Sequence, residues 1–239
     1  MTQERILVII PAFNEEKRIA PVIGGVREYL PLGQILIVDD GSRDGTRQKA
    51  EAEGAKVISH PYNLGYGAAL QTGYKYALRM GYEAIVQMDG DGQHDPSFIP
   101  DLIAVIQKRE ADISIGSRFL KGDRESDPSI YRAPLIRKLG MKLFRTITSL
   151  LIQQKVTDST SGYQAMNRKV LEWVSGEQFP VDYPDADVII MLHRAGFRIK
   201  EVPVRMFEGK DKESMHSGWK PLYYVFKMFL SIGVTLMRK

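Results

Sequence analysis

The chain has 239 residues, of which 44% are hydrophobic and 26% charged, and its 33 Lys and Arg against 29 Asp and Glu give a formal net charge of +4 at pH 7. This length and composition are typical of one globular domain, so we expect a single domain over residues 1–239. The small positive charge gives no reason to expect a nucleic-acid binder. The absence of cysteine excludes disulfides and thiolate sites. The apolar run near the N-terminus is too short for a signal peptide, so we expect a chain that faces the cytosol.

The first half of the sequence alternates short β-branched segments with segments of helical periodicity. Strands are predicted at residues 6–10, 35–38, 56–58, 84–88 and 112–115. Helices are predicted at residues 15–29, 44–53, 67–80 and 96–108. The last of these helices starts with Asp95 and Pro96, a typical N-cap and first-turn pair. The alternation indicates an α/β fold with a parallel sheet, whose ligand crevice lies at the carboxyl ends of the strands.

The second half adds one polar segment and two helices. Residues 117–131 are polar and charged, which fits either a mobile loop near the site or an exposed connection. A basic amphipathic helix is predicted at residues 133–154. Residues 219–239 are apolar and aromatic but include Lys227, which favours a helix lying at a membrane interface over one that crosses the bilayer.

The segment VQMDGDGQHDP places Asp89 and Asp91 in a glycine-rich turn after an apolar strand. Two close carboxylates repel each other unless a cation lies between them, and hard oxygen ligands favour Mg²⁺ or Mn²⁺. Gln93 offers a further neutral oxygen ligand. The alternative is an Asp-Gly turn with solvated carboxylates, and the buried-looking strand before it favours the metal site. His94 is expected at the rim of this site.

The segment IVDDGSRDGT also ends a strand in acidic residues. One of them, Asp39, is placed to bind a ribose or a base, whereas Asp40 is the better candidate for bracing the turn. The segment NLGYGAALQTGY has Leu70 where a dinucleotide motif needs its third glycine, and the sequence holds no P-loop. Phosphate must then be held by a metal and by basic side chains. The candidates are Arg118, Arg132, Lys210 and Lys212.

In chain order, VIIPAFNEE, IVDDGSRDGT, NLGYGAALQTGY, DGDGQHDP and STSGYQAMNR resemble family-two inverting glycosyltransferases, most of all the dolichyl-phosphate mannose synthase and bacterial polyprenyl-phosphate sugar transferase branch. The resemblance implies the GT-A fold, a mostly parallel sheet flanked by helices. It implies that Asp89 and Asp91 hold the metal, with Gly90 between them and Gln93 beside them. It also implies a nucleotide-binding turn at Pro11, Ala12, Asn14 and Glu15, a base or ribose contact at Asp39, and phosphate contacts at Arg118 and Arg132.

The sequence departs from this family pattern in two places. It lacks the paired C-terminal transmembrane helices of many members and has only the apolar segment at residues 219–237. The arginine usual before a glycine-serine stretch near residue 217 is missing, and Lys210 or Lys212 is the candidate replacement. The acceptor is therefore the least constrained part of the prediction.

We therefore expect a metal-dependent inverting enzyme that moves a sugar from a nucleotide-sugar to a polyprenyl phosphate at the inner face of the cell membrane. A phosphate acceptor is already anionic and needs no strong base. A sugar hydroxyl, as on a lipid-linked or cell-surface glycan, is the alternative acceptor and would need one. The candidate bases are Asp158, Asp185 and Asp187, although the dipole of a helix N-terminus also explains Asp185.

Two other functions and two other uses of the C-terminal surface remain as alternatives. A nucleotidyltransferase shares the sheet and the carboxylates but should carry a glycine-rich basic loop where this chain has PAFNEE. A non-catalytic module would bind nucleotide-sugars without needing the metal. The apolar C-terminal surface could instead mediate homo-oligomerisation or bind a small membrane protein.

Overall fold

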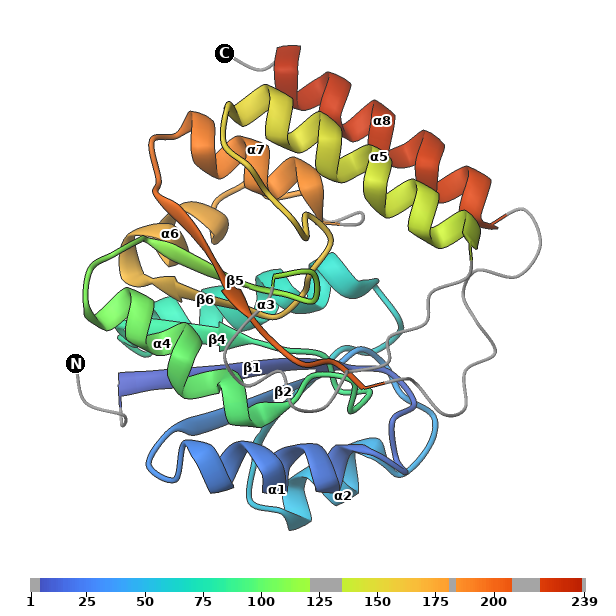
Figure 1. Ribbon diagram of the computed structural model, residues 1–239. Helices are drawn as coiled ribbons and strands as arrows, with labels where there is room; N and C mark the ends of the chain where they lie inside the picture. Colours follow the sequence, from blue (N-terminus) through green and yellow to red (C-terminus); the bar gives the residue numbers. More distant parts are fainter. Residues whose placement is uncertain (1–4, 121–134, 181–183, 208–219, 238–239) are drawn as a thin grey trace.

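The computed structural model describes residues 5–120, 135–180, 184–207 and 220–237 (Figure 1). The strands are β1 (Ile6–Ala12), β2 (Gln34–Asp39), β3 (Lys56–Ser59), β4 (Ala84–Gln87), β5 (Ile113–Ser117), β6 (Gln164–Asn167) and β7 (Ile199–Pro203). The helices are α1 (Ile19–Tyr29), α2 (Thr46–Ala52), α3 (Tyr66–Arg79), the short 3₁₀ helix η2 (Pro96–Phe98), α4 (Ile99–Gln107), α5 (Leu135–Ile152), α6 (Arg168–Val174), α7 (Ala186–Arg194) and α8 (Lys220–Met237).

The strands form one seven-stranded sheet in the order β3-β2-β1-β4-β6-β5-β7. Strand β6 pairs antiparallel with β4 and β5, and the other pairs are parallel. In the register of β1 with β2, Ala12 lies opposite Asp39. The ends of these two strands and of β4 therefore meet at one edge of the sheet, where a parallel sheet holds its ligands.

The sheet is covered by helices on both faces, because successive side chains of its central strands point to opposite sides. In β1, Leu7 and Ile9 belong to the core cluster that α3, α5, α6 and α7 close. Ile6, Val8 and Ile10 belong to the cluster that α1 and α4 close. This explains why the strand reads as an unbroken apolar run, ILVIIPA.

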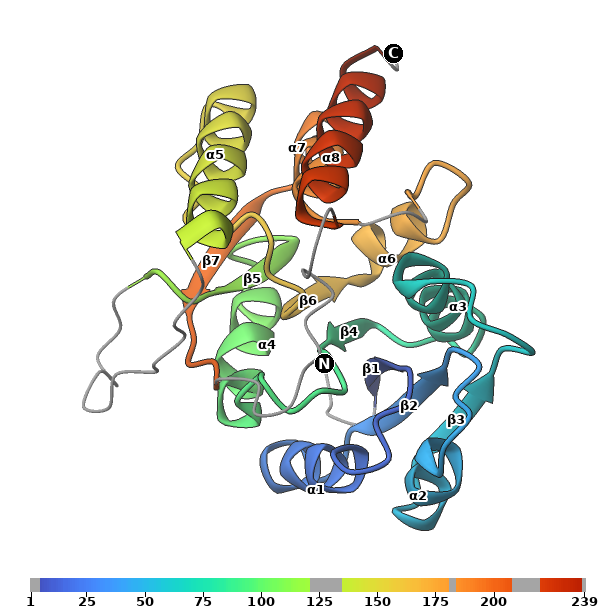
Figure 2. The same cartoon turned by 90° about the vertical axis from the view of Figure 1, so that its right-hand side faces the viewer.

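Helices α5, α7 and α8 form a layer at one end of the molecule, at the top of both overall views (Figures 1 and 2). The rings of Phe144 on α5 and Phe229 on α8 lie 5.7 Å apart, centroid to centroid. Arg194 on α7 donates a hydrogen bond to the carbonyl oxygen of Thr235 on α8. Within the residues that the structure describes, no helix is long and apolar enough to cross a membrane.

The α/β fold and every element predicted in the first half are confirmed, with shifts at their ends. The largest shift is in α1, which begins at Ile19 and not at residue 15. The amide groups of Glu15 and Glu16 donate instead to the side chains of Thr46 and Asp44, so the chain is held in a turn there. The predicted helices at 133–154 and 219–239 correspond to α5 and α8. Strands β6 and β7 are additional to the five predicted strands. The predicted loop at 117–131 lies mostly outside the described residues.

Candidate active site

The turn after β4 carries the two predicted metal-binding carboxylates and packs tightly against the end of β1. A Cβ atom on Gly90 would lie 3.2 Å from the carbonyl oxygen of Pro11, and Gly92 has a φ of +74°. A side chain would be strained at the second position and crowded at the first. Asp91 accepts hydrogen bonds from the backbone amide of Gln93 (3.0 Å) and from its side-chain nitrogen (2.9 Å).

Asp89 lies beside residues from two distant segments. The Tyr66 hydroxyl at the start of α3 donates to Asp89 Oδ1 at 2.9 Å. A Cβ atom on Gly162 would lie 3.3 Å from the same oxygen, so the backbone before β6 packs directly over this carboxylate. Desolvation of the hydroxyl, followed by the neighbouring Asp89 charge, raises the pKa of Tyr66 well above the usual 10.0, although the residue as a whole is 38% exposed. Tyr66 therefore remains a hydrogen-bond donor to Asp89.

The chemistry of this turn fits a divalent cation. Asp89, Asp91 and the amide oxygen of Gln93 are hard oxygen ligands within five residues. Among the described residues, no group of three or more acidic or histidine side chains could enclose a metal ion. A cation held here would complete its coordination with water or substrate phosphates, as Mg²⁺ commonly does.

His94 is not at the rim, contrary to the prediction. Its side chain is buried and stacks on Tyr163, with ring centroids 4.8 Å apart. Its Nδ1 atom accepts a hydrogen bond from the backbone amide of Asp89 (3.1 Å). Burial lowers the pKa of His94 below 6.5, which keeps the neutral form that can accept this bond. His94 thus supports the turn that carries Asp89 and Asp91.

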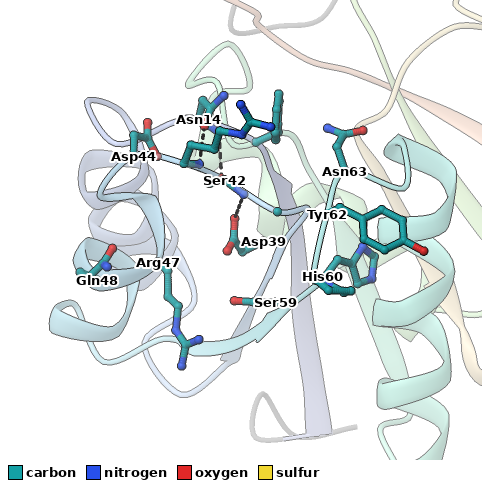
Figure 3. A pocket seen from close by; sticks show the side chains of 14 residues that line it. Asn14, Asp39, Ser42, Asp44, Arg47, Gln48, Ser59, His60, Tyr62 and Asn63 are labelled. Atoms are coloured by element: carbon teal, nitrogen blue, oxygen red, sulfur yellow. Dashed lines mark hydrogen bonds between the residues drawn. The ribbon is translucent and has the colours of Figure 1, made fainter.

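A cavity of about 520 Å³ opens beside the ends of β1 and β2 (Figure 3). Asn14 and Asp39 line it, together with the 41–44 turn and residues 59–63. The Asn14 side-chain oxygen accepts from the Arg43 amide, and Ser42 accepts from the Asn14 amide. These bonds hold Asn14 at a φ of 56°, a left-handed conformation that asparagine tolerates.

Three other predicted donor-binding residues do not line this cavity: Pro11, Ala12 and Glu15. Pro11 and Ala12 are the last residues of β1. Glu15 binds Arg18 through its carboxylate at 2.9 Å and Thr46 through its backbone amide. Asp39, which does line the cavity, is buried and accepts a hydrogen bond from the Ser42 amide at Oδ1.

Asp40 has the bracing role that the sequence suggested, but for a different segment. Its carboxylate accepts hydrogen bonds from the amides of Leu64 and Gly65, both at 2.9 Å, and lies 2.7 Å from His60 Nδ1. Asp40 therefore fixes the chain between β3 and α3, which both lines the cavity and leads to Tyr66.

Arg118 and Asp158 were predicted separately as a phosphate-binding residue and a candidate base, and the structure pairs them. Two hydrogen bonds of 2.6 and 2.7 Å join the guanidinium to the carboxylate, and the two side chains are only 7% and 1% exposed. Both carboxylate oxygens of Asp158 therefore accept a hydrogen bond from Arg118. Arg132, Lys210 and Lys212 lie outside the described residues.

Asp187, another candidate base, is fully buried at the first turn of α7. It accepts hydrogen bonds from the backbone amides of Asp185 and Val188 and from the hydroxyl of Ser231 on α8. Burial raises its pKa. Asp185 occupies the N-cap position of α7, as the helix-terminus interpretation predicted.

Comparison with known proteins identifies the family. Residues 7–174 match the profile described as "Glycosyl transferase family 2". The chain belongs to glycosyl transferase family 2. It is accordingly an enzyme that uses a nucleotide-sugar donor, and the nucleotidyltransferase and non-catalytic alternatives are excluded.

Relatives within this family cover most of the chain. It is 32% identical to the polyprenol monophosphomannose synthase of Mycolicibacterium smegmatis, over 94% of this chain and 86% of that protein. It is 31% identical to the undecaprenyl-phosphate mannosyltransferase of Micrococcus luteus, over 90% and 88%. It is 33% identical to a UDP-N-acetylglucosamine–dolichyl-phosphate N-acetylglucosaminyltransferase of Methanococcus voltae, over 86% of each chain.

Solved structures confirm the GT-A fold of this family-two enzyme. Glucosyl-3-phosphoglycerate synthase from Mycobacterium tuberculosis, in complex with Mn²⁺ and UDP-glucose, superposes with a TM-score of 0.69. The match covers 95% of this chain and 79% of the synthase at 23% identity.

Sequence patterns alone did not point to two residues of this candidate site. Tyr66 and Gly162 were not predicted to contribute, although each lies in a segment that carries the family resemblance. Glycine and tyrosine at those places are also common in turns and helix ends, so only their contacts distinguish them.

Proposed function

We propose that this enzyme transfers a sugar from a nucleoside diphosphate to a polyprenyl phosphate at a membrane surface, with a divalent cation bound by Asp89 and Asp91. The names of the three relatives all specify a lipid phosphate, whereas their sugars differ between mannose and N-acetylglucosamine. The acceptor class is therefore better supported than the identity of the sugar.

The observation that carries this proposal is an apolar surface on two neighbouring helices. Leu143, Leu150 and Leu151 are exposed on α5, and Leu150 is 72% exposed. Phe229, Leu230 and Met237 are exposed on α8, and Met237 is 77% exposed. The spacing of seven between Leu143 and Leu150, and between Leu230 and Met237, puts each pair on one helix face. An interfacial helix needs such an apolar stripe.

The burial of two candidate bases also favours a phosphate acceptor. Asp158 is bound to Arg118 and Asp187 is bound to Ser231, and both carboxylates are buried. A sugar hydroxyl would need a base that can reach it, whereas a phosphate already carries negative charge at neutral pH. The geometry therefore supports the acceptor that needs no proton removed.

The roles of the residues follow from their positions. The cavity at Asn14 and Asp39 would bind the nucleoside, and Asp89 and Asp91 would hold the cation at the diphosphate. A divalent cation there would neutralise charge on the departing diphosphate. Asp158 would orient Arg118 toward phosphate oxygens, a geometry that guanidinium groups suit. Attack on the sugar opposite the diphosphate would invert the configuration at C1.

The test is to incubate the enzyme with Mn²⁺, undecaprenyl phosphate and radiolabelled UDP-, GDP- or dTDP-sugars, and to count label in the organic phase. Label from one donor is expected. Nucleoside diphosphate formed without labelled lipid would contradict the lipid acceptor and direct the search to hydroxyl acceptors.

Asp91→Asn provides the control for the metal. The loss of a metal ligand should weaken metal binding more than the loss of a residue that only hydrogen-bonds to a ligand. We therefore expect turnover to fall at least about 100-fold, with an unchanged circular dichroism spectrum. Chelation of the metal with EDTA should have the same effect on the unaltered enzyme. Unchanged turnover in either experiment would overturn the metal assignment.

A further inference from the structure

A chain of hydrogen bonds runs from the core of the sheet to Asp89. The hydroxyl of Tyr74 donates to the side-chain oxygen of Gln87. The Gln87 side-chain nitrogen donates to the Tyr66 hydroxyl at 3.2 Å. That hydroxyl donates in turn to Asp89 Oδ1 at 2.9 Å. Each hydroxyl has one proton to donate, so the direction of the whole chain is fixed and ends on the carboxylate.

The buried amide of Gln87 is the central link of this hydrogen-bond chain. Gln87 is buried in β4, directly after the apolar residues 84–86. A buried amide costs free energy unless its donor and acceptor are both satisfied, and an apolar side chain would avoid that cost. Gln87 is satisfied by two tyrosines, Tyr66 and Tyr74, eight residues apart on α3.

The hydrogen-bond chain ends at Asp89, and contacts of Asp40 and Gly162 fix this end. Asp40 accepts a hydrogen bond from the amide of Gly65, the N-cap residue of α3, so it fixes the backbone directly before Tyr66. A Cβ atom on Gly162 would lie 2.8 Å from the Tyr66 hydroxyl and 3.3 Å from Asp89 Oδ1. The glycine thus allows the backbone to cover the hydrogen bond between Tyr66 and Asp89.

Oδ1 of Asp89 accepts the hydrogen bond from Tyr66, and the Asp89 side chain as a whole is 33% exposed. Oδ2 lies 3.7 Å from Nε2 of His94, beyond hydrogen-bonding distance. Among the described residues, Oδ2 is therefore the oxygen of Asp89 left to face a cation.

We propose that Tyr66 is a positioning residue: through the chain from Tyr74 and Gln87 it holds Asp89 Oδ1 and thereby presents Oδ2 to the divalent cation, with Gly162 as the glycine that permits the contact. This inference rests on the proposed metal role of Asp89. It assigns a role to Tyr66 in the segment NLGYGAALQTGY and to Gly162 in STSGYQAMNR.

The test measures Mn²⁺ binding without turnover, from the electron paramagnetic resonance signal of free Mn²⁺ in the presence of UDP or GDP. Tyr66→Phe removes the hydroxyl and keeps the ring. We expect Mn²⁺ to bind about 10- to 100-fold more weakly, the range for lost outer-shell partners of metal ligands. Turnover should recover at high Mn²⁺ concentration, which a merely structural defect would not show.

Two further variants and one control make the result specific. Tyr74→Phe should weaken Mn²⁺ binding less, because it breaks the chain two bonds from the carboxylate. Gly162→Ala should weaken it through crowding of the Tyr66 hydroxyl, and it serves as the test if Tyr66→Phe does not fold. Tyr76→Phe, on the same helix but outside the chain, should bind Mn²⁺ like the unaltered enzyme.

The outcomes separate this inference from the proposed function. If the unaltered enzyme binds Mn²⁺ and folded Tyr66→Phe binds it equally well, the positioning role is overturned and the metal site stands. If the unaltered enzyme binds no Mn²⁺ with either nucleotide, the metal assignment and the positioning role are both overturned.

Discussion

At the scale of single residues, the pair of Arg118 and Asp158 joins two segments that flank residues 121–156. Arg118 follows β5 and Asp158 precedes β6, and each carries a buried charge that the other balances. The backbone amide of Asp158 donates to Glu201 on β7, which also accepts from the amide of Thr157. The pair is thus fixed to the sheet, which agrees with the phosphate-binding role that we propose for Arg118.

Asp158→Ala should therefore act on stability as well as on activity. It leaves the Arg118 charge buried and unpaired, so we expect a loss of about 3–5 kcal/mol in the free energy of unfolding, measured by urea titration. The double variant Arg118→Met/Asp158→Ala should lose less than the sum of the single variants. A stability change below about 1 kcal/mol together with lost turnover would instead favour Asp158 as a base.

At the scale of elements, α3 lies unusually close to β1. A Cβ atom on Gly73 would lie 2.5 Å from Cγ2 of Ile9 in the core, whereas one on Gly24 in α1 would meet nothing within 4 Å. Both glycines are inside helices, where alanine is ordinarily the more stable residue. The close approach at Gly73 brings α3, and so Tyr66 at its start, down onto the sheet.

Gly73→Ala and Gly24→Ala should accordingly have opposite effects on the free energy of unfolding. Overpacking against Ile9 should lower the free energy of unfolding by about 1–3 kcal/mol. Gly24→Ala should raise it by about 0.5–1 kcal/mol, because the helix gains propensity without a clash. Thermal unfolding of both variants measures this, and stabilisation by Gly73→Ala would contradict the close packing.

The apolar surface of α5 and α8 should bind membranes. Leu150→Asp and Leu230→Asp each put a charge into it, so we expect weaker partitioning onto liposomes that contain anionic phospholipid, with Tm nearly unchanged. Leu32→Asp is the matched control, since Leu32 is also exposed but lies in the turn after α1. Equal partitioning of all three variants would exclude this surface as the membrane contact.

At the scale of the whole molecule, the buried carboxylate of Asp187 ties the last helix to the rest of the fold. It joins α7 to Ser231 of α8, and burial raises its pKa above the usual 3.8. At a pH between 3.8 and the raised pKa, Asp187 keeps its proton in the folded protein but has lost it in the unfolded chain. The contribution of Asp187 to stability therefore falls as the pH rises through the raised pKa.

Asp187→Asn removes this pH dependence and keeps a side chain of the same shape. The Tm of the variant relative to the unaltered enzyme should increase as the pH is raised from 3.8 to the raised pKa of Asp187, and should be constant above it. Turnover with the lipid acceptor should be retained, because Asp187 is buried. A Tm difference that is constant from pH 3.8 upward would contradict the raised pKa, and loss of turnover in the folded variant would restore Asp187 as a candidate base.

The sequence by itself determined the features that depend on local order along the chain. Short β-branched runs of three to five residues predicted the strands of the first half, and the glycines around Asp89 and Asp91 predicted the turn that carries them. The position of Asp39 at the end of the second strand placed it at the ligand edge. Local pattern suffices here, because a parallel sheet brings successive strand ends to the same edge.

Only the tertiary structure decided which distant side chains meet. Tyr66 contacts Asp89 across 23 residues, and Arg118 contacts Asp158 across 40. His94 is buried because Tyr163 stacks on it, and Tyr163 is placed there by β6, a four-residue strand that enters the sheet antiparallel between β4 and β5. A strand so short has little periodicity of its own, and its place is set by pairing with strands far away in the sequence.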